Sequence, residues 1–136
     1  MISVLGVQQC AFIVKDIGEA IKFYEELFGF DVVRSPEPDW PCAWLQIQPS
    51  QQLHLIEREE PEQFLDPESV RHLAFGVPDL QAAITELVNR RLGAFCYDPQ
   101  GNRREVNSEN IKLMGTQAVF FRDPSGNLVK LVQSPS

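Results

Sequence analysis

The sequence has few of the residues that usually build a metal centre or a disulfide framework. Its 136 residues include only 2 histidines and 3 cysteines. Cys10, Cys42 and Cys96 stand singly within apolar runs, and an odd number without a C-x-x-C spacing makes neither a disulfide framework nor a structural zinc cluster. We therefore expect buried thiols and a reducing compartment, which points to a cytoplasmic protein.

Basic side chains are also in the minority. The chain has 12 Lys and Arg against 19 Asp and Glu, a formal net charge of −7. Binding to nucleic-acid phosphates needs a surplus of Lys and Arg, so this balance argues against a nucleic-acid partner. An acidic surface is compatible with cationic ligands, but more often it only keeps a protein soluble.

Long apolar runs are missing as well, and no stretch approaches the roughly 20 residues of a membrane span. The N-terminus, Met1-Ile2-Ser3-Val4, has no charged region followed by an apolar one, so we expect no signal peptide. We expect no membrane association, and a single compact domain that buries about two-thirds of its unfolded surface.

What the sequence does contain is a repeated opening. Residues 9–16 read QCAFIVKD and residues 72–79 read HLAFGVPD, so Ala, Phe, Val and Asp recur at matching places. A helical pattern follows the Asp in both copies. The spacing is too long for a solenoid repeat and indicates one duplication, with Gln9 and His72 in equivalent positions.

Each copy predicts the order β-α-β-β-β within half-modules at 7–57 and 70–133. In the first, we expect strands at 7–14, 30–34, 42–48 and 51–57, and a helix from its Asp16 cap to Gly29. In the second, we expect strands at 70–77, 95–97, 116–122 and 128–133, and a helix from Asp79 to Gly93. Proline-rich residues 36–41 predict a loop, charged residues 58–69 a linker, and polar residues 98–115 a long loop that is either functional or mobile.

Alternation along the predicted strands indicates which side chains share a face. On 70–77 the bulky residues are expected to face the helix, which places His72 on the other face, as Gln9 is on the first strand. His54 and Lys130 are lone polar residues in otherwise apolar strand segments. Because an unpaired buried polar group costs roughly a few kcal/mol, these four positions together predict a site.

These features resemble the vicinal oxygen chelate superfamily, which includes glyoxalase I, bleomycin resistance proteins, extradiol dioxygenases and methylmalonyl-CoA epimerase. The resemblance rests on the two modules, their LAF-x-V-x-D type openings and the close F-x-R-D-P-x-G-N-L-x-x-L at 120–131. It covers residues from about 7 to 133. It implies an α+β fold in which two tandem βαβββ modules form a curved mixed sheet around a central cavity, and it implies homodimers.

By motif position, the resemblance implies that a divalent ion would be held at Gln9, His54, His72 and Lys130. An amide oxygen and two imidazoles can ligate Zn, Ni, Co, Mn or Fe. Lys130 departs from the pattern, because metal-using relatives have Glu at this point. A protonated lysine has no lone pair, and deprotonating it at pH 7 costs about 4–5 kcal/mol. We therefore expect no bound metal; if one is present, it would use Gln9, His54, His72 and waters.

The missing carboxylate would also move a proton next to a carbonyl in glyoxalase-like chemistry. Glu57 is no substitute, because it lies three residues beyond His54 and hence on the opposite face of the strand. Glu105 and Glu109 lie in the predicted long loop, where the sequence does not place them. We therefore expect no glyoxalase I activity.

Two functions remain open, besides that of a degenerate relative with an interaction role. The first is a lyase/isomerase-like or dioxygenase-like enzyme acting on a small oxygenated or conjugated metabolite, with Lys130, His54 and His72 as catalytic residues. In it, the Lys130 ammonium would replace the charge of the metal and hold a carboxylate, phosphate or enolate oxygen. The second is a metal-free protein that sequesters a drug or toxin, as bleomycin resistance proteins do, in which Lys130 would only pair with a carboxylate or reach solvent.

The expected partner in both cases is a small molecule. Trp44, Met114 and Phe120, with Tyr97, are the large side chains expected to line its pocket, although single residues of this kind are also ordinary core residues. The acidic charge and the missing Glu favour a binding protein. The two histidines favour an enzyme, since sequestration alone does not need them.

Overall fold

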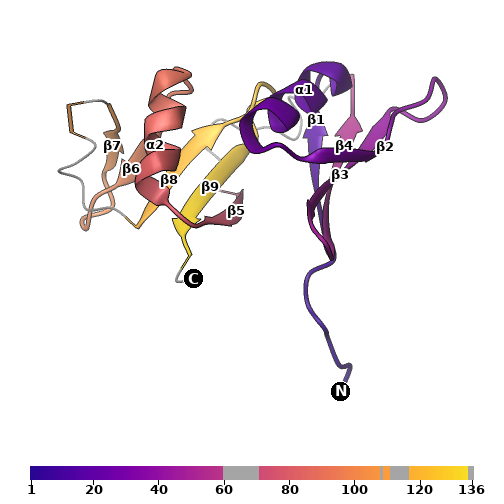
Figure 1. The fold of residues 1–136 in the computed structure, drawn as a ribbon, viewed down its shortest axis with the longest axis horizontal. Helices are drawn as coiled ribbons and strands as arrows, with labels where there is room; N and C mark the ends of the chain where they lie inside the picture. The colour runs from indigo at the N-terminus through magenta and orange to yellow at the C-terminus, as the bar shows by residue number, and fades with distance from the viewer. Residues whose placement is uncertain (60–70, 108, 111–116, 135–136) are drawn as a thin grey trace. The chain divides into compact units, whose positions relative to one another are not determined.

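The computed structural model describes residues 1–59, 71–107, 109–110 and 117–134 (Figure 1). The chain divides into two compact units, Met1–Ser69 with Pro124–Asn127, and Val70–Asp123 with Leu128–Ser136. Each unit is described by itself below. The linker predicted at 58–69 lies almost wholly outside the described residues. Each unit contains one helix and one mixed sheet, so the α+β class is confirmed.

The sheet of the first unit has the strand order β1-β4-β3-β2. β1 (Gln9–Val14) runs parallel to β4 (Gln51–Glu57), and the antiparallel neighbours β3 (Cys42–Gln48) and β2 (Asp31–Arg34) follow. All four predicted strands are present. Only their starts differ, because β1 begins at Gln9 rather than at residue 7, and β2 begins at Asp31.

Helix α1 (Ile17–Phe28) covers one face of this sheet and has the predicted ends. The Asp16 carboxylate accepts a hydrogen bond of 3.0 Å from the Glu19 N–H. Gly29 closes the helix at a φ of 71°, a left-handed conformation that favours a residue without a Cβ. The core of the unit lies between helix and sheet and includes Val14, Ala20, Tyr24, Ala43, Leu45, Leu53 and Leu55.

The sheet of the second unit has five strands in the order β5-β9-β8-β6-β7. β5 (His72–Val77) runs parallel to β9 (Leu128–Gln133), β9 pairs with β8 (Ala118–Arg122), and β6 (Phe95–Tyr97) follows. β7 (Arg103–Glu105) lies inside the stretch expected to be a loop, so that prediction was wrong there. Its charged sequence has no strand pattern, and its pairing with β6 makes it a strand.

Helix α2 (Leu80–Asn89) begins as predicted, since the Asp79 carboxylate accepts from the Ala82 N–H at 3.0 Å. Its predicted end at Gly93 was wrong. The helix ends at Asn89, because the Arg90 N–H already closes the last turn on the Glu86 carbonyl and Arg91 takes a left-handed φ of 55°. Gly93 is also left-handed, with a φ of 68°, but it belongs to the connection that leads to β6.

Alternation along β5 agrees with the predicted faces, because Leu73, Phe75 and Val77 are more covered than the exposed His72, Ala74 and Gly76. Beneath α2 the core includes Ile84, Leu87, Val119, Phe121, Val129 and Leu131. Neither α1 nor α2, the helices of the described part of the chain, is long and apolar enough to cross a membrane.

Candidate functional site

In each unit, one row of cross-strand neighbours lies on the sheet face turned away from the helix. The row of the first unit consists of Ala11, His54, Trp44 and Arg34. The row of the second unit consists of Ala74, Lys130, Phe120 and Phe95. The strand neighbours of these residues, such as Leu53 and Val129, are buried in the core, so alternation puts the rows on the opposite face. His54 and Lys130 therefore hold equivalent places in the duplicated units.

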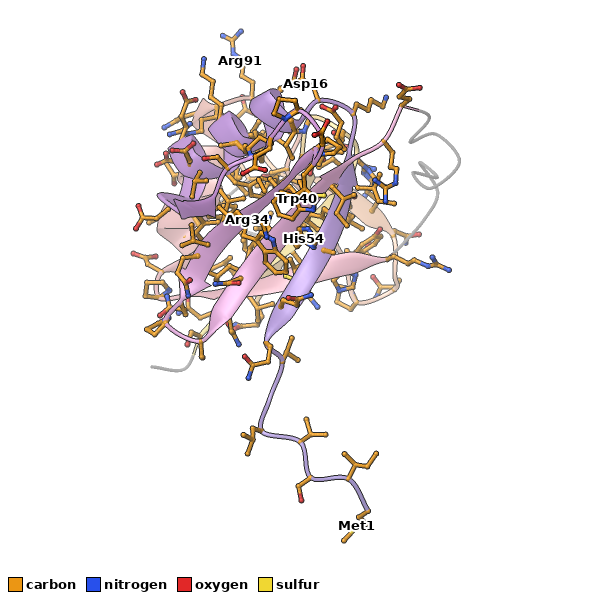
Figure 2. The ribbon with its side chains drawn as sticks, turned by 90° about the vertical axis from the view of Figure 1, so that its right-hand side faces the viewer. Met1, Asp16, Arg34, Trp40, His54 and Arg91 are labelled. Atoms are coloured by element: carbon orange, nitrogen blue, oxygen red, sulfur yellow. The ribbon has the colours of Figure 1, made fainter. Side chains whose placement is uncertain are left out.

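The row of the first unit carries a stack of flat groups. The His54 imidazole lies on the Trp44 indole, with ring centroids 4.0 Å apart and planes within 7°. Trp40 is near-parallel to His54 at 6.3 Å, and the Arg34 guanidinium lies 3.7 Å from the centre of the Trp40 ring. Figure 2 shows Arg34, Trp40 and His54 close together over the sheet. Stacked groups of this kind stabilise a fold through the apolar area that they bury and through the electrostatic attraction of a ring for another ring or for a cation.

Trp40 is a residue of this stack that the sequence did not reveal. It lies in the proline-rich connection between β2 and β3, where Glu37 and Trp40 exchange backbone hydrogen bonds of 3.0 and 2.9 Å. This small bridge holds the indole beside the sheet. In the sequence, Trp40 stands only two residues before the strand that carries Trp44. This proximity alone was not enough to predict that the two side chains meet at His54.

The His54 imidazole is partly desolvated. Its Nε2 is buried and has no hydrogen-bond partner among the described residues. Burial lowers the pKa of His54 from its usual value, because an apolar environment disfavours the charged ring. The ring is therefore neutral at pH 7. A neutral imidazole with an unpartnered nitrogen is a group that can still exchange a hydrogen bond with a ligand.

The row of the second unit carries a cation on an aromatic cluster. The Lys130 ammonium lies 5.6 Å from the centre of the Phe120 ring, within the range of a cation–π contact. Phe120 also stacks on Phe95 at 5.6 Å and meets Tyr97 edge-to-face at 5.3 Å. The His72 ring meets Phe120 edge-to-face at 5.5 Å. Phe120 and Tyr97, both expected to line a pocket, thus lie with His72 and Lys130 on one sheet face.

The other predicted residues lie as follows. Gln9 is exposed at the start of β1 and pairs with Gln52, as His72 at the start of β5 pairs with Leu128. Met114 lies outside the described residues. Because Gln9 and His54 belong to one unit and His72 and Lys130 to the other, the four-residue site stays a prediction.

The three glutamates differ in their surroundings. Glu57 lies on the opposite face from His54, as predicted, where its Oε2 accepts from the Ile17 N–H at 2.8 Å and stabilises the start of α1. Glu105 pairs with Arg103 at 3.2 Å. Glu109 is exposed, and its N–H donates to the side chain of Asn107. None of these contacts places a carboxylate next to His54 or Lys130.

The predicted donor set does not fit a divalent ion. Within the described ranges, no group of three or more His, Cys, Asp and Glu side chains lies together. In the row of the first unit, His54 is the one side chain of these four kinds, and its neighbours are Ala11 and Trp44. At the equivalent place of the second unit, the Lys130 ammonium would repel a cation.

The two βαβ-containing units define a glyoxalase-like α+β fold. The sequence model of the Glyoxalase/Bleomycin resistance protein/Dioxygenase superfamily matches residues 6–131, and the chain belongs to this superfamily. The resemblance inferred from the sequence is thereby confirmed. No curated protein sequence matches the chain.

Three solved structures illustrate the range of relatives. Lactoylglutathione lyase from Agrobacterium tumefaciens is 18% identical, with a TM-score of 0.65 over 96% of this chain and 95% of its own. The fosfomycin resistance protein FosX from Mesorhizobium loti is 16% identical, with a TM-score of 0.66 over 97% and 94%. TnmS3, an antibiotic binding protein from a Streptomyces species, is 25% identical, with a TM-score of 0.63 over 98% of both chains. The first two likenesses show the fold alone.

Proposed function

We propose that this protein binds a flat, conjugated small molecule without the help of a metal ion. The observation that carries the proposal is the stack of His54 on Trp44, at 4.0 Å and 7°. Rings fixed in one plane offer a flat ligand a large contact area, and they lose little conformational entropy because they have few rotatable bonds. Exposed Ala11, next to His54 in the row, leaves room beside the imidazole.

Two further observations support binding over metal catalysis. Lys130 stands where metal-using relatives have a carboxylate, and it removes both a ligand and a proton-transfer group. TnmS3, 25% identical over 98% of both chains, is described as an antibiotic binding protein. We infer that the present chain also binds a small molecule, a conjugated compound held on the sheet face that carries the stack of His54 on Trp44.

The test uses the chain's own tryptophans. Trp40 and Trp44 are the only 2 in the sequence, and both lie beside His54. We would titrate the protein with a panel of flat conjugated compounds, starting with 2-naphthoate, in the presence of EDTA. We expect saturable quenching that EDTA leaves unchanged. Quenching that disappears with EDTA and returns with zinc would contradict a metal-free site.

Variants locate the binding. Replacing Trp44→Leu should weaken binding about tenfold, since stacking of a ring on an aromatic side chain contributes about 1–3 kcal/mol. Val33→Ala is the matched control, because Val33 is a 51% exposed apolar residue on β2 outside the stack. Equal affinity in wild type and Trp44→Leu would place the ligand elsewhere. Because Trp44→Leu removes one of the two fluorescent tryptophans, the affinity of this variant is measured by calorimetry.

A second candidate is a metal-free lyase- or isomerase-like enzyme acting on a small oxygenated or conjugated metabolite. The observation that favours it is the unpartnered Nε2 of His54, which is neutral at pH 7 and able to take a proton. His54→Ala and His72→Ala separate the two functions. Loss of turnover with retained ligand affinity would indicate an enzyme. Reduced ligand affinity, with no turnover lost in either variant, would indicate a binding protein.

Glyoxalase I activity is not expected in either case. An assay with methylglyoxal and glutathione, with added zinc, nickel or cobalt, should show no robust turnover.

The cytoplasmic location and the homodimer also stay predictions. Light scattering of the purified protein tests the second, with a mass of about twice the 15.4 kDa of one chain expected.

A further inference from the structure

The sheet face that points away from α2 carries an excess of cations. Alternation along β7 and β9 puts Arg103 and Lys130 on it, whereas Glu105 is the one carboxylate that the described strands place there. Glu105 already pairs with Arg103 at 3.2 Å. The chain as a whole has a net charge of −7, so this positive face is the reverse of the average surface.

Lys130 is the cation on this face that most needs a partner. It is half-buried, and its strand neighbours Val129 and Leu131 are in the core. Within the part of the second unit that the structure describes, no carboxylate lies within ion-pair distance of its ammonium. Its cross-strand neighbours are Ala74, which is small and exposed, and Phe120. A partly desolvated ammonium of this kind favours an anionic group next to it.

The surroundings of Lys130 are aromatic. Its ammonium lies over the Phe120 ring, and Phe95 and Tyr97 pack around Phe120 at 5.6 and 5.3 Å. Tyr97 is 44% exposed. The Arg103 guanidinium repeats the arrangement, 3.7 Å from the centre of the Phe95 ring. Cations held on ring faces next to an exposed aromatic edge suit a ligand that combines a flat ring with a negative charge.

We propose that this face of the second unit binds a small molecule with an ionised acidic group, a carboxylate or a phenolate on a conjugated ring, and that Lys130 on the Phe120 ring recognises this group. The inference goes beyond the proposed function, because it concerns a face of the second unit and does not depend on the stack of His54 on Trp44 in the first. Phe120 supplies the contact to the conjugated part of the ligand. Ala74 leaves the space in which the acidic group reaches the ammonium.

The experiment compares two probes with the same ring. 2-Naphthoate and 2-naphthamide differ in charge but hardly in shape, and calorimetry measures the affinity of each for the full chain. We expect 2-naphthoate to bind at least about tenfold more tightly than 2-naphthamide, and we expect added salt to weaken 2-naphthoate alone. Lys130→Gln should reduce the affinity for 2-naphthoate to the level of 2-naphthamide, and Lys130→Arg should retain most of it.

Lys15→Gln is the matched control, since it removes one positive charge at an exposed position of the first unit. It should leave both affinities unchanged. Thermal unfolding of each variant verifies that it is folded, and Lys130→Arg keeps the test decisive if Lys130→Gln is unstable.

The outcomes separate the inference from the proposed function. Equal binding of both probes to wild type would overturn the acidic-group inference and leave the proposed function standing. Equal losses in Lys15→Gln and Lys130→Gln would also overturn it, because overall charge rather than Lys130 would then be responsible. Failure of 2-naphthoate to bind would overturn the inference as well, whereas the proposed function would be contradicted only if no flat conjugated compound quenched the tryptophan fluorescence.

Discussion

The imidazole of His54 lies flat on the indole of Trp44, with ring centroids 4.0 Å apart and planes within 7°. The two residues are cross-strand partners in the antiparallel pair of β3 and β4. The equivalent partners in the second unit are Phe120 and Lys130, where an ammonium lies 5.6 Å from a ring centre. In both units the polar residue in the middle of the last strand is thus placed on an aromatic ring of the neighbouring strand.

The first prediction concerns the energy of this stack. A double-mutant cycle with Trp44→Leu and His54→Leu should give a favourable coupling of about 0.5–1.5 kcal/mol in the free energy of unfolding, because aromatic pairs contribute about this much beyond their burial. Urea unfolding at pH 7.5, followed by circular dichroism, measures it. Strictly additive effects of the two substitutions would show that the stacked geometry adds nothing to stability.

The second prediction concerns pH. Burial lowers the pKa of His54 below its unfolded value, so the unfolded chain takes up a proton more readily than the folded one. Its contribution to stability is complete above about pH 6.5 and is lost as the pH falls below that value. The free energy of unfolding should therefore fall between pH 7.5 and 5, and less so in His54→Gln. Identical pH profiles of the two proteins would contradict a desolvated His54.

Asp98 provides an internal comparison for that experiment. The Asn102 N–H and the Arg104 side chain, which both donate to its carboxylate, lower the pKa of Asp98. The contribution of Asp98 to the free energy of unfolding is present above its pKa in the unfolded chain. It is lost as the pH falls through the folded pKa, hence below about pH 4. The two effects occupy separate windows, and Asp98→Asn should change only the acidic one.

The third prediction concerns the start of each helix. Glu57 accepts from the Ile17 N–H at 2.8 Å, and Gln133 accepts from the Leu80 N–H at 2.9 Å at the same place in the second unit. Glu57→Ala should lower the free energy of unfolding by about 0.5–2 kcal/mol, the usual effect of a lost helix cap. Glu57→Gln should lose less, since the second unit uses this residue. Glu59→Ala, which removes a nearby exposed carboxylate, is the control, and an equal effect there would exclude a capping role.

The fourth prediction concerns metals. Zinc or nickel should not raise the melting temperature of the wild-type protein. Within the described ranges, no three or more His, Cys, Asp and Glu side chains lie together, so these residues offer an ion too few ligands to stabilise the folded protein. Elemental analysis showing one tightly bound ion per wild-type chain would contradict this expectation.

Much of the fold could be predicted because its determinants are local. Asp16 and Asp79 cap their helices through contacts three residues away, and Gly29 ends α1 with its own left-handed conformation. Alternation along the strands assigned their faces correctly. The end of α2 and the strand β7 could not be predicted, since Arg90 closes a helix without a distinctive signal and β7 becomes a strand only by pairing with β6.

The sequence by itself determined the duplicated modules and the equivalence of Gln9 with His72, because the repeated motif, the strand period and the helix caps follow from neighbouring residues, and its motifs carried the resemblance to the superfamily. The tertiary structure decided what these residues contact. Stacking of Trp40 and Trp44 on His54, and of Lys130 on Phe120, depends on strand register and on the turn that carries Trp40. Strand register brings together residues that are distant in the chain. For that reason the ring contacts of His54 and Lys130 could be found only in the folded structure.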